Sequence, residues 1–156
     1  MTADIEVEVE ADLWRELPEA ERLVRTAAEA ALGPEGEGAL AILLTDDAAV
    51  RELNGRWRGK DAPTNVLSFP AAPTAAPWLG DVALAYETCA REAAEQGKPL
   101  AHHITHLVAH GVLHLLGWDH QTDAEADEME ALERDILARL GVPDPYRDRE
   151  ARIDHG

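Results

Sequence analysis

The sequence predicts an α+β protein, a single domain in which helices pack on a four-stranded mixed sheet. Hydropathy and turn residues give the element order β-α-β-α-β-β-α-α-α, in which most helices follow the strands. No internal repeat and no linker divides the 156 residues, a length that is usual for one domain. Hydrophobic residues make up 46% of the chain, which is enough to build a core.

The first half of the chain predicts two strands, each followed by a helix. Residues 4–10 alternate apolar and charged side chains, as a strand with one solvent face does. A helix over 18–32 begins with a proline and is stopped by the Gly-Pro pair that follows it. The nearly continuous apolar run at 39–45 predicts a strand buried on both faces. A short helix over 46–53 is capped by one of two consecutive aspartates.

The second half predicts two strands and then three helices. A strand over 64–69 is ended by a proline, and another over 79–86 contains a Gly-Asp pair that marks a bulge or a close backbone approach. Helices follow over 87–96 and 99–116, the second of which we expect to be central. The last helix, over 122–140, begins with the capping box Thr-x-x-Glu.

The net charge of −17, from 31 acidic and 14 basic residues, argues by itself against binding to nucleic acid. The distribution of the charges softens this objection. Acidic residues gather at 4–21 and 123–135, whereas the stretch NGRWRGK at 54–60 is locally basic. An acidic protein of this kind still has room for one positive face.

The sequence indicates a cytoplasmic protein without a membrane partner. No apolar run approaches the roughly 20 residues that a membrane helix needs. The acidic N-terminal stretch lacks the basic and apolar regions of a secretory signal. Cys89, the one cysteine, excludes an intrachain disulfide, and we expect it to be a small buried residue.

The most informative motif is H-x-x-x-H-x-x-G-x-x-H, formed by His110, His114, Gly117 and His120. Residues four apart lie on the same face of a helix, so the first two imidazoles can point at one metal ion. Gly117 ends the helix and lets the chain fold back, so that His120 returns as a third ligand. Three imidazoles with an open fourth position are typical of catalytic zinc, although nickel and copper also bind imidazole.

Other histidines share this helix. His106 stands one turn before His110 and is either a partner that orients a metal ligand or an ordinary polar core residue. We expect His102 and His103, near the start of the helix, to lie on the surface. A zinc peptidase with this pattern needs a glutamate as general base after the first ligand, and Gly111 stands there instead.

Three blocks of the sequence follow fixed patterns. The block from His110 to His120 fits H-G-x-L-H-L-x-G-x-D-H at every fixed position. The block from Leu53 to Pro70 fits L-N-x-x-[YW]-R-x-x-D-x-P-T-[DN]-V-L-S-F-P, and Gly80-Asp81-Val82 fits G-D-[IV]. In this order the blocks resemble the YbeY family of bacterial endoribonucleases and ribosomal RNA maturation factors.

The resemblance implies an α+β fold with a zincin-like metal site, which we expect to hold one zinc ion per chain. It implies a single-strand-specific endoribonuclease that matures the 3′ end of small-subunit (16S) ribosomal RNA and serves ribosome quality control. The implied partners are single-stranded RNA, ribosomal RNA, and the ribosome or its small-subunit proteins. We expect the endoribonuclease domain to cover residues 1–142 and a polar C-terminal tail to cover 143–156.

The expected mechanism is attack of a metal-bound hydroxide on an RNA phosphodiester. The predicted catalytic residues are His114, as a metal ligand, and Arg58, whose guanidinium matches phosphate oxygens. The matching arginine is taken to be functional in the family; an ion pair with Asp61 is the structural alternative. No general base is evident, and Asp119 either assists the metal or fixes the turn before His120.

Two further side chains allow two interpretations each. Ser68 either contacts the phosphate or bonds to backbone, and Trp57 either stacks on a base or packs half-buried. Two functions compete with the ribonuclease. One is a metallopeptidase-like or other metal-dependent hydrolase, and the other is a non-catalytic ribosome assembly factor whose acidic surface docks on basic ribosomal proteins.

Overall fold

The computed structural model describes residues 4–33, 36, 38–59, 64–118 and 121–146. These residues form one α+β domain around a four-stranded mixed sheet, as predicted. The strands run in the order β1-β2-β4-β3, in which the first three are parallel and β3 is antiparallel to β4 at one edge. Their bounds are Asp4–Val9 for β1, Ala39–Thr45 for β2, Val66–Pro70 for β3 and Trp78–Ala85 for β4.

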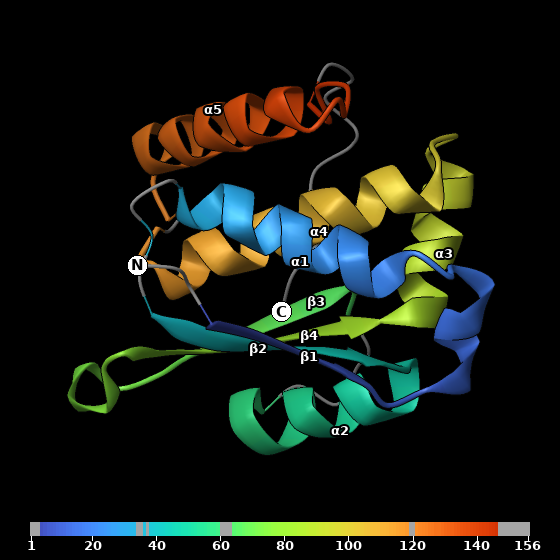
Figure 1. Cartoon of the computed structure of the whole chain (residues 1–156), viewed down its shortest axis with the longest axis horizontal. Helices are drawn as coiled ribbons and strands as arrows, with labels where there is room; N and C mark the ends of the chain where they lie inside the picture. Colours follow the sequence, from blue (N-terminus) through green and yellow to red (C-terminus); the bar gives the residue numbers. More distant parts are fainter. Residues whose placement is uncertain (1–3, 34–35, 37, 60–63, 119–120, 147–156) are drawn as a thin grey trace.

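Helices cover both faces of the sheet (Figure 1). One face is covered by α1 (Ala20–Leu32) and α4 (Leu100–Leu115), and α5 (Asp123–Arg139) lies further out across them. The other face is covered by α2 (Asp47–Arg58), while α3 (Tyr86–Glu95) follows β4 directly. The sequence did not predict two short 3-10 helices, Asp12–Glu16 and Pro73–Ala75.

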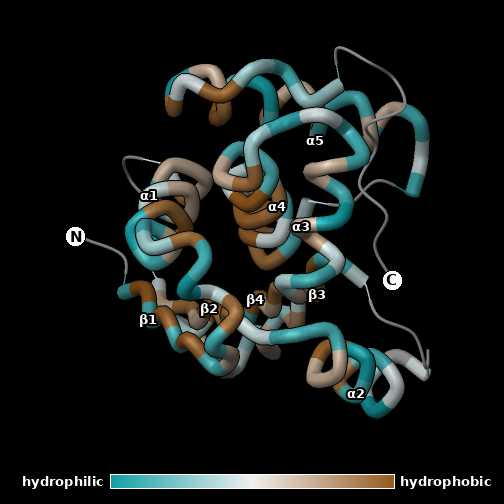
Figure 2. Tube along the Cα trace, turned by 90° about the vertical axis from the view of Figure 1, so that its right-hand side faces the viewer, coloured by the Kyte–Doolittle hydropathy of each residue, from teal (hydrophilic) through white to brown (hydrophobic). Residues whose placement is uncertain are grey.

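The central position of α4 follows from its sequence. Figure 2 shows this helix as the most hydrophobic element, enclosed by α1, α5 and the sheet. Every residue of α4 from His103 to Leu113 is buried, as expected of a helix that is apolar around most of its circumference. Full burial of each large apolar side chain contributes about 1.5–3 kcal/mol. The helix therefore gives its histidines a rigid support.

The boundaries of most elements agree with the sequence prediction within two residues, but the end predicted for α2 was wrong. Asp46 caps this helix, because its carboxylate accepts a hydrogen bond from the backbone N–H of Ala49 at 2.8 Å. We expected the helix to stop at Leu53, but it continues to Arg58. Gly59 ends it, with a φ of 71° that few other residues adopt.

The expected irregularity at Gly80 is confirmed. The register between β2 and β4 shifts between Ala39 and Leu40, which is a β-bulge. A Cβ atom on Gly80 would lie only 2.3 Å from the carbonyl oxygen of Phe69. Glycine is therefore required there for β3 and β4 to pair. The expected burial of Cys89 is also confirmed, at 0% exposure.

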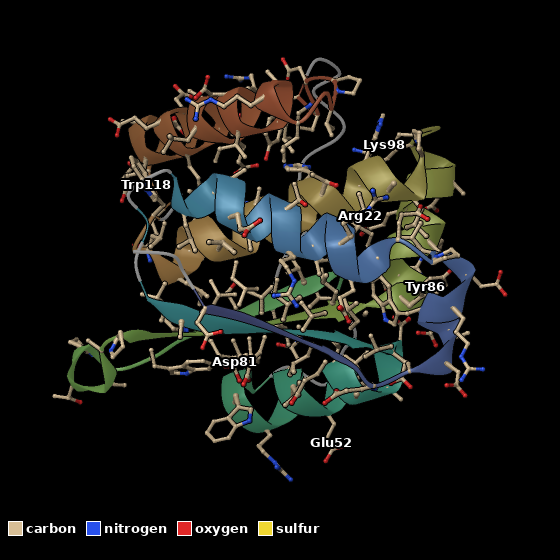
Figure 3. The ribbon with its side chains drawn as sticks, in the orientation of Figure 1. Arg22, Glu52, Asp81, Tyr86, Lys98 and Trp118 are labelled. Atoms are coloured by element: carbon tan, nitrogen blue, oxygen red, sulfur yellow. The ribbon has the colours of Figure 1, made fainter. Side chains whose placement is uncertain are left out.

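Part of the acidic charge gathers on the sheet face that looks toward α2. Glu6 and Glu8 alternate along β1 with the inward-facing Ile5, and Asp81 occupies the same face on β4 (Figure 3). Burial, and then the charges of Glu8 and Glu6, raise the pKa of Asp81. This acidic group lies across the sheet from α4, where the histidines are.

Candidate metal centre

His110 and His114 lie one turn apart on α4, and their rings meet edge to face. The ring centroids are 4.6 Å apart at an interplanar angle of 80°, and the two Nε2 atoms are 3.1 Å apart. His110 is only 3% exposed, whereas His114, nearer the end of the helix, is partly buried. The predicted pair of ligands therefore converges, with one ring reaching toward the molecular surface.

Gly111 lets α4 pack closely enough to hold this pair against the sheet. A Cβ atom at this position would lie 2.9 Å from Cγ1 of Val82 and 3.2 Å from the hydroxyl of Ser68. The Ser68 hydroxyl donates a hydrogen bond to the carbonyl of Gly111 at 3.1 Å, which ties β3 to α4. The position that bears the general base in zinc peptidases thus faces the sheet, where a longer side chain has no room.

Helix α4 ends directly after His114, at the Gly117 position that the sequence predicted. The backbone N–H of Gly117 donates to the carbonyl of His114, and that of Trp118 donates to the carbonyl of Leu113, both at 3.0 Å. Gly117 has a φ of 100°. This Schellman arrangement ends the helix and satisfies two of its last carbonyls. The chain therefore leaves the helix axis at Gly117, three residues before His120 in the sequence.

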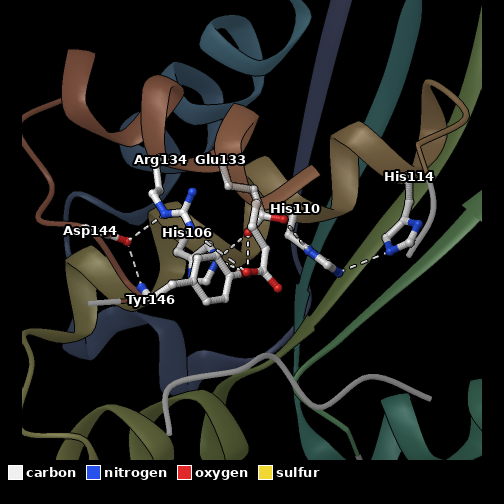
Figure 4. A network of polar contacts seen from close by, with 8 residues as sticks. His106, His110, His114, Glu133, Arg134, Asp144 and Tyr146 are labelled. Atoms are coloured by element: carbon white, nitrogen blue, oxygen red, sulfur yellow. Dashed lines mark hydrogen bonds and ion pairs between the residues drawn. The ribbon is translucent and has the colours of Figure 1, made fainter. Parts of the chain in front are cut away.

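Glu133 of α5 joins His106, His110 and Tyr146 in one network (Figure 4). Its Oε2 accepts a hydrogen bond from Nδ1 of His110 at 3.0 Å. Its Oε1 accepts one from Nε2 of His106 and one from the hydroxyl of Tyr146, both at 2.6 Å. Because the side chains of Glu133 and His106 are each only 1% exposed, this carboxylate relies on the protein rather than on water for its hydrogen bonds.

The network fixes the charge of Glu133. Burial by itself raises the pKa of a carboxyl group, but hydrogen bonds from His106 and His110 outweigh it and hold the pKa of Glu133 well below its usual range. Burial also lowers the pKa of His106, and Glu133 opposes this shift without overcoming it. An ionised carboxylate thus faces a neutral His106 that donates through Nε2.

The donor set of this pair fits a zinc ion. With Nδ1–H of His110 given to Glu133, Nε2 of His110 is the nitrogen that carries a lone pair, on the side of His114. Two nitrogens bound to zinc at about 2.0–2.1 Å and near the tetrahedral angle stand about 3.3 Å apart. The observed separation of 3.1 Å is close to this value. A carboxylate behind the ligand is also the usual arrangement for a metal-bound histidine.

Of the four predicted site residues, the structure brings His110 and His114 together, and it leaves His120 and the side chain of Arg58 undescribed. His120 and Asp119 are outside the described residues, and within those residues no group of three or more His, Cys, Asp or Glu is arranged to hold a metal. Arg58 is the last residue of α2, and only its backbone is described. Trp57, beside it, is 66% exposed, which excludes the half-buried alternative.

The expectation for His103 was wrong. This side chain is 3% exposed, and its Nε2 lies 2.9 Å from Oε1 of Glu92 on α3. Asn65 donates to the same oxygen at 2.9 Å, so the three residues tie α3, α4 and the start of β3 together. Position near a helix start indicated exposure, but α3 covers this side of α4.

Sequence reasoning missed Glu133 and Tyr146. Glu133 lies four residues after Met129 and four before Leu137, both of which are buried. A glutamate in the middle of an apolar stripe is unusual, since an unpaired buried carboxylate is costly, and this signal identifies it as a partnered residue. Tyr146 carried no such signal. Of the two interpretations of His106, the structure favours the partner in the ligand network.

Comparison with known proteins supports the same family as the sequence blocks. The family model described as Endoribonuclease YbeY matches residues 5–141. A relative named Endoribonuclease YbeY from Bradyrhizobium sp. (strain BTAi1) is 54% identical over 161 residues, which covers 96% of this chain and 95% of the relative. A relative of the same name from Nitrobacter hamburgensis is 55% identical over 157 residues, with 93% and 83% covered.

A solved structure resembles the fold. The solution structure of TM1509 from Thermotoga maritima superposes with a TM-score of 0.53 at 23% identity, and the match covers 95% of this chain and 99% of that one. Among the helices that the structure describes, none combines the length and the apolar character that a membrane crossing needs. With its family model matched from residue 5 to residue 141, the chain belongs to the endoribonuclease YbeY family.

Proposed function

We propose that this chain is a metal-dependent endoribonuclease that cleaves single-stranded RNA, matures the 3′ end of small-subunit ribosomal RNA and serves ribosome quality control. Membership of the family supports RNA cleavage. The single observation that supports metal dependence is the convergence of His110 and His114, with Nε2 atoms 3.1 Å apart and a carboxylate behind His110.

The proposed metal is one zinc ion per chain, held by His110, His114 and His120. Imidazole nitrogens and their spacing support zinc, although nickel shares this preference for imidazole. When bound, zinc would supply a nucleophile near neutral pH, because it lowers the pKa of a bound water to about 7. The protein holds one ligand rigidly, through the contact between Glu133 and His110, and leaves His114 partly open to solvent.

The proposed role of Arg58 is to bind the phosphate that is cleaved. Negative charge grows on the phosphate oxygens during the attack, and a guanidinium offers two parallel N–H donors to them. Figure 1 shows the C-terminal ends of α2 and α4 at the same end of the sheet, on its opposite faces. Exposed Trp57, adjacent in the chain, offers a surface on which an RNA base can stack.

The two competing functions differ in their support. Two observations argue against a peptidase. Gly111, which packs against Val82, stands where a zinc peptidase has its glutamate base. The family to which the chain belongs is also one of ribonucleases. A non-catalytic assembly factor is favoured by the net charge of −17, which suits docking on basic ribosomal proteins. Docking and cleavage are compatible, and we propose the ribosome or its small-subunit proteins as partners of the enzyme.

The remaining proposals concern location and chain organisation. A cytoplasmic location follows from a ribosomal RNA substrate. An endoribonuclease domain over residues 1–142 and a tail over 143–156 remain a proposed division. The first residues of that tail contact α5, because Asp144 pairs with Arg134 at 3.4 Å and Tyr146 bonds to Glu133.

The direct test is cleavage of single-stranded RNA by purified wild-type protein, with the zinc content measured on the same samples. His114→Ala removes a ligand, and His102→Ala makes the same substitution on the same helix outside the centre. We expect cleavage and one zinc per chain in the wild type and in His102→Ala, and neither in His114→Ala. Equal cleavage by all three proteins would show a contaminant. If His114→Ala still associates with ribosomes, an assembly role exists beside the catalytic one.

A further inference from the structure

We propose that Glu133 is a positioning residue that fixes the ring of His110 as a metal ligand, and that Tyr146 in the C-terminal segment holds Glu133 in place. This inference deepens the proposed function, because it rests on His110 being a ligand. Neither residue belongs to the sequence blocks that identified the site, and neither touches the side of His110 that faces His114.

Glu133 fixes the orientation of the His110 ring. A histidine ring can rotate and can carry its proton on either nitrogen, and only one combination presents a lone pair at Nε2. Oε2 of Glu133 accepts the hydrogen of Nδ1 at 3.0 Å, which selects both the rotation and the proton position. The ring is therefore arranged for a metal on the side of His114 before any ion arrives.

Glu133 is itself held rigidly. Its other oxygen accepts hydrogen bonds from Nε2 of His106 and the hydroxyl of Tyr146, each at 2.6 Å. Together with His110 these contacts hold both carboxylate oxygens from two helices and the C-terminal segment (Figure 4). A carboxylate fixed at both oxygens cannot turn away from its ligand.

Tyr146 is held in place by contacts of its ring and of its backbone. Its ring meets that of His106 edge to face, with centroids 5.4 Å apart, and the guanidinium of Arg134 lies over it at 5.8 Å. Its backbone N–H donates to the carboxylate of Asp144 at 2.8 Å, and Arg134 also pairs with Asp144. These contacts hold the segment around Tyr146 against α5, beside the carboxylate of Glu133. They link the C-terminal segment to the metal centre.

The consequence is a dependence of metal affinity on residues that do not touch the metal. Groups that orient a metal-bound histidine typically change metal affinity by 10- to 100-fold when they are removed. In Glu133→Gln, the amide can accept from one histidine through its oxygen but presents N–H donors to the other. The Gln side chain has nearly the same size, so the substitution tests hydrogen bonding more than packing.

The experiment measures zinc affinity by competition with a chromogenic chelator, on metal-free protein reloaded with zinc alone. We expect the dissociation constant to rise 10- to 100-fold in Glu133→Gln, and to rise by a smaller factor in Tyr146→Phe, which keeps the ring and loses the hydroxyl. Glu128→Gln, exposed on the same helix, and Tyr86→Phe are matched controls that we expect to bind as the wild type does. Unchanged affinity in Glu133→Gln and Tyr146→Phe would overturn the proposal.

A second readout separates positioning from general stability. Long-range nitrogen–proton NMR spectra of the metal-free wild type report which nitrogen of His110 carries the proton. We expect Nδ1, with a loss of this preference in Glu133→Gln. A wild-type His110 protonated at Nε2 alone would overturn the proposal, whether or not any variant folds. Zinc binding that weakens as expected, in a protein that leaves RNA intact, would support this inference and contradict only the proposed substrate.

Discussion

A Cβ atom on Gly111 would lie 2.9 Å from Cγ1 of Val82, so α4 packs on β4 at a distance that only glycine permits. In an unstrained helix position, replacing glycine by alanine stabilises by about 1 kcal/mol. We predict the opposite sign for Gly111→Ala, a loss of about 1–3 kcal/mol in the free energy of unfolding, because Val82 or the helix must move. Urea unfolding of the metal-free proteins measures it.

The control for this prediction is a double-mutant cycle with Val82→Ala. Removing the methyl groups of Val82 removes the closest contact, so Gly111→Ala should cost less in that background than in the wild type. An equal cost in both backgrounds would place the strain elsewhere.

A second prediction concerns Glu92, whose stability contribution depends on pH. Burial raises the pKa of Glu92, but hydrogen bonds from His103 and Asn65 outweigh it, and the folded-state pKa of Glu92 lies below its ordinary value. A depressed pKa contributes stability above the unfolded-state value, and this contribution is lost as the pH falls through the folded-state value. Glu92→Gln should therefore cost roughly 1–3 kcal/mol at pH 7 and much less at a pH below the folded-state pKa of Glu92.

Urea unfolding of wild type and Glu92→Gln at both pH values gives this difference directly. Glu95→Gln, on the exposed side of the same helix, serves as the matched control and should change stability little at either pH. A difference between wild type and Glu92→Gln that stays constant with pH would mean that the contribution of Glu92 does not come from its charge.

A third prediction concerns the start of α5, the helix that carries Glu133. The hydroxyl of Thr122 accepts a hydrogen bond from the backbone N–H of Glu125 at 3.1 Å, as the capping box predicted. Thr122→Ala should destabilise the protein by about 1 kcal/mol in thermal or urea unfolding. Thr26→Ala, exposed inside α1, should be neutral or stabilising, since alanine is the better helix former there.

Much of the fold could be predicted from the sequence. Strand alternation, the apolar run of β2 and the caps of α2 and α5 are local signals, and they placed the elements and the sheet composition correctly. The end of α2 was misplaced because Asn54-Gly55 disfavours a helix, whereas Asn54 is 2% exposed and packs in the fold. Tertiary burial overrode local preference there.

The site was predictable only where it is encoded in one segment. His110, Gly111 and His114 lie within one turn of helix, so their spacing alone indicated a shared face. Glu133 reaches His110 from 23 residues away, and Tyr146 reaches His106 from 40 residues away, which no periodicity reveals. The burial of His103 under α3 was missed for the same reason, because it depends on how two helices pack.

A fourth prediction concerns Arg58. If its guanidinium stabilises charge on the phosphate, Arg58→Ala should lower the rate of RNA cleavage about 100-fold or more and leave the zinc content at the wild-type value. Arg56→Ala is the matched control, because Arg56 is exposed on the same helix and pairs with Glu52 at 3.6 Å. Loss of zinc together with activity in Arg58→Ala would assign this residue to the fold of the centre rather than to the substrate.

Removal and return of the metal tests whether RNA cleavage depends on zinc. Wild-type protein is stripped with a chelator, titrated with zinc, and assayed for cleavage of single-stranded RNA at each step. We expect no cleavage by the metal-free protein and a linear recovery that saturates at one zinc per chain, through His110 and His114. Full cleavage by protein shown to be free of metal would contradict it.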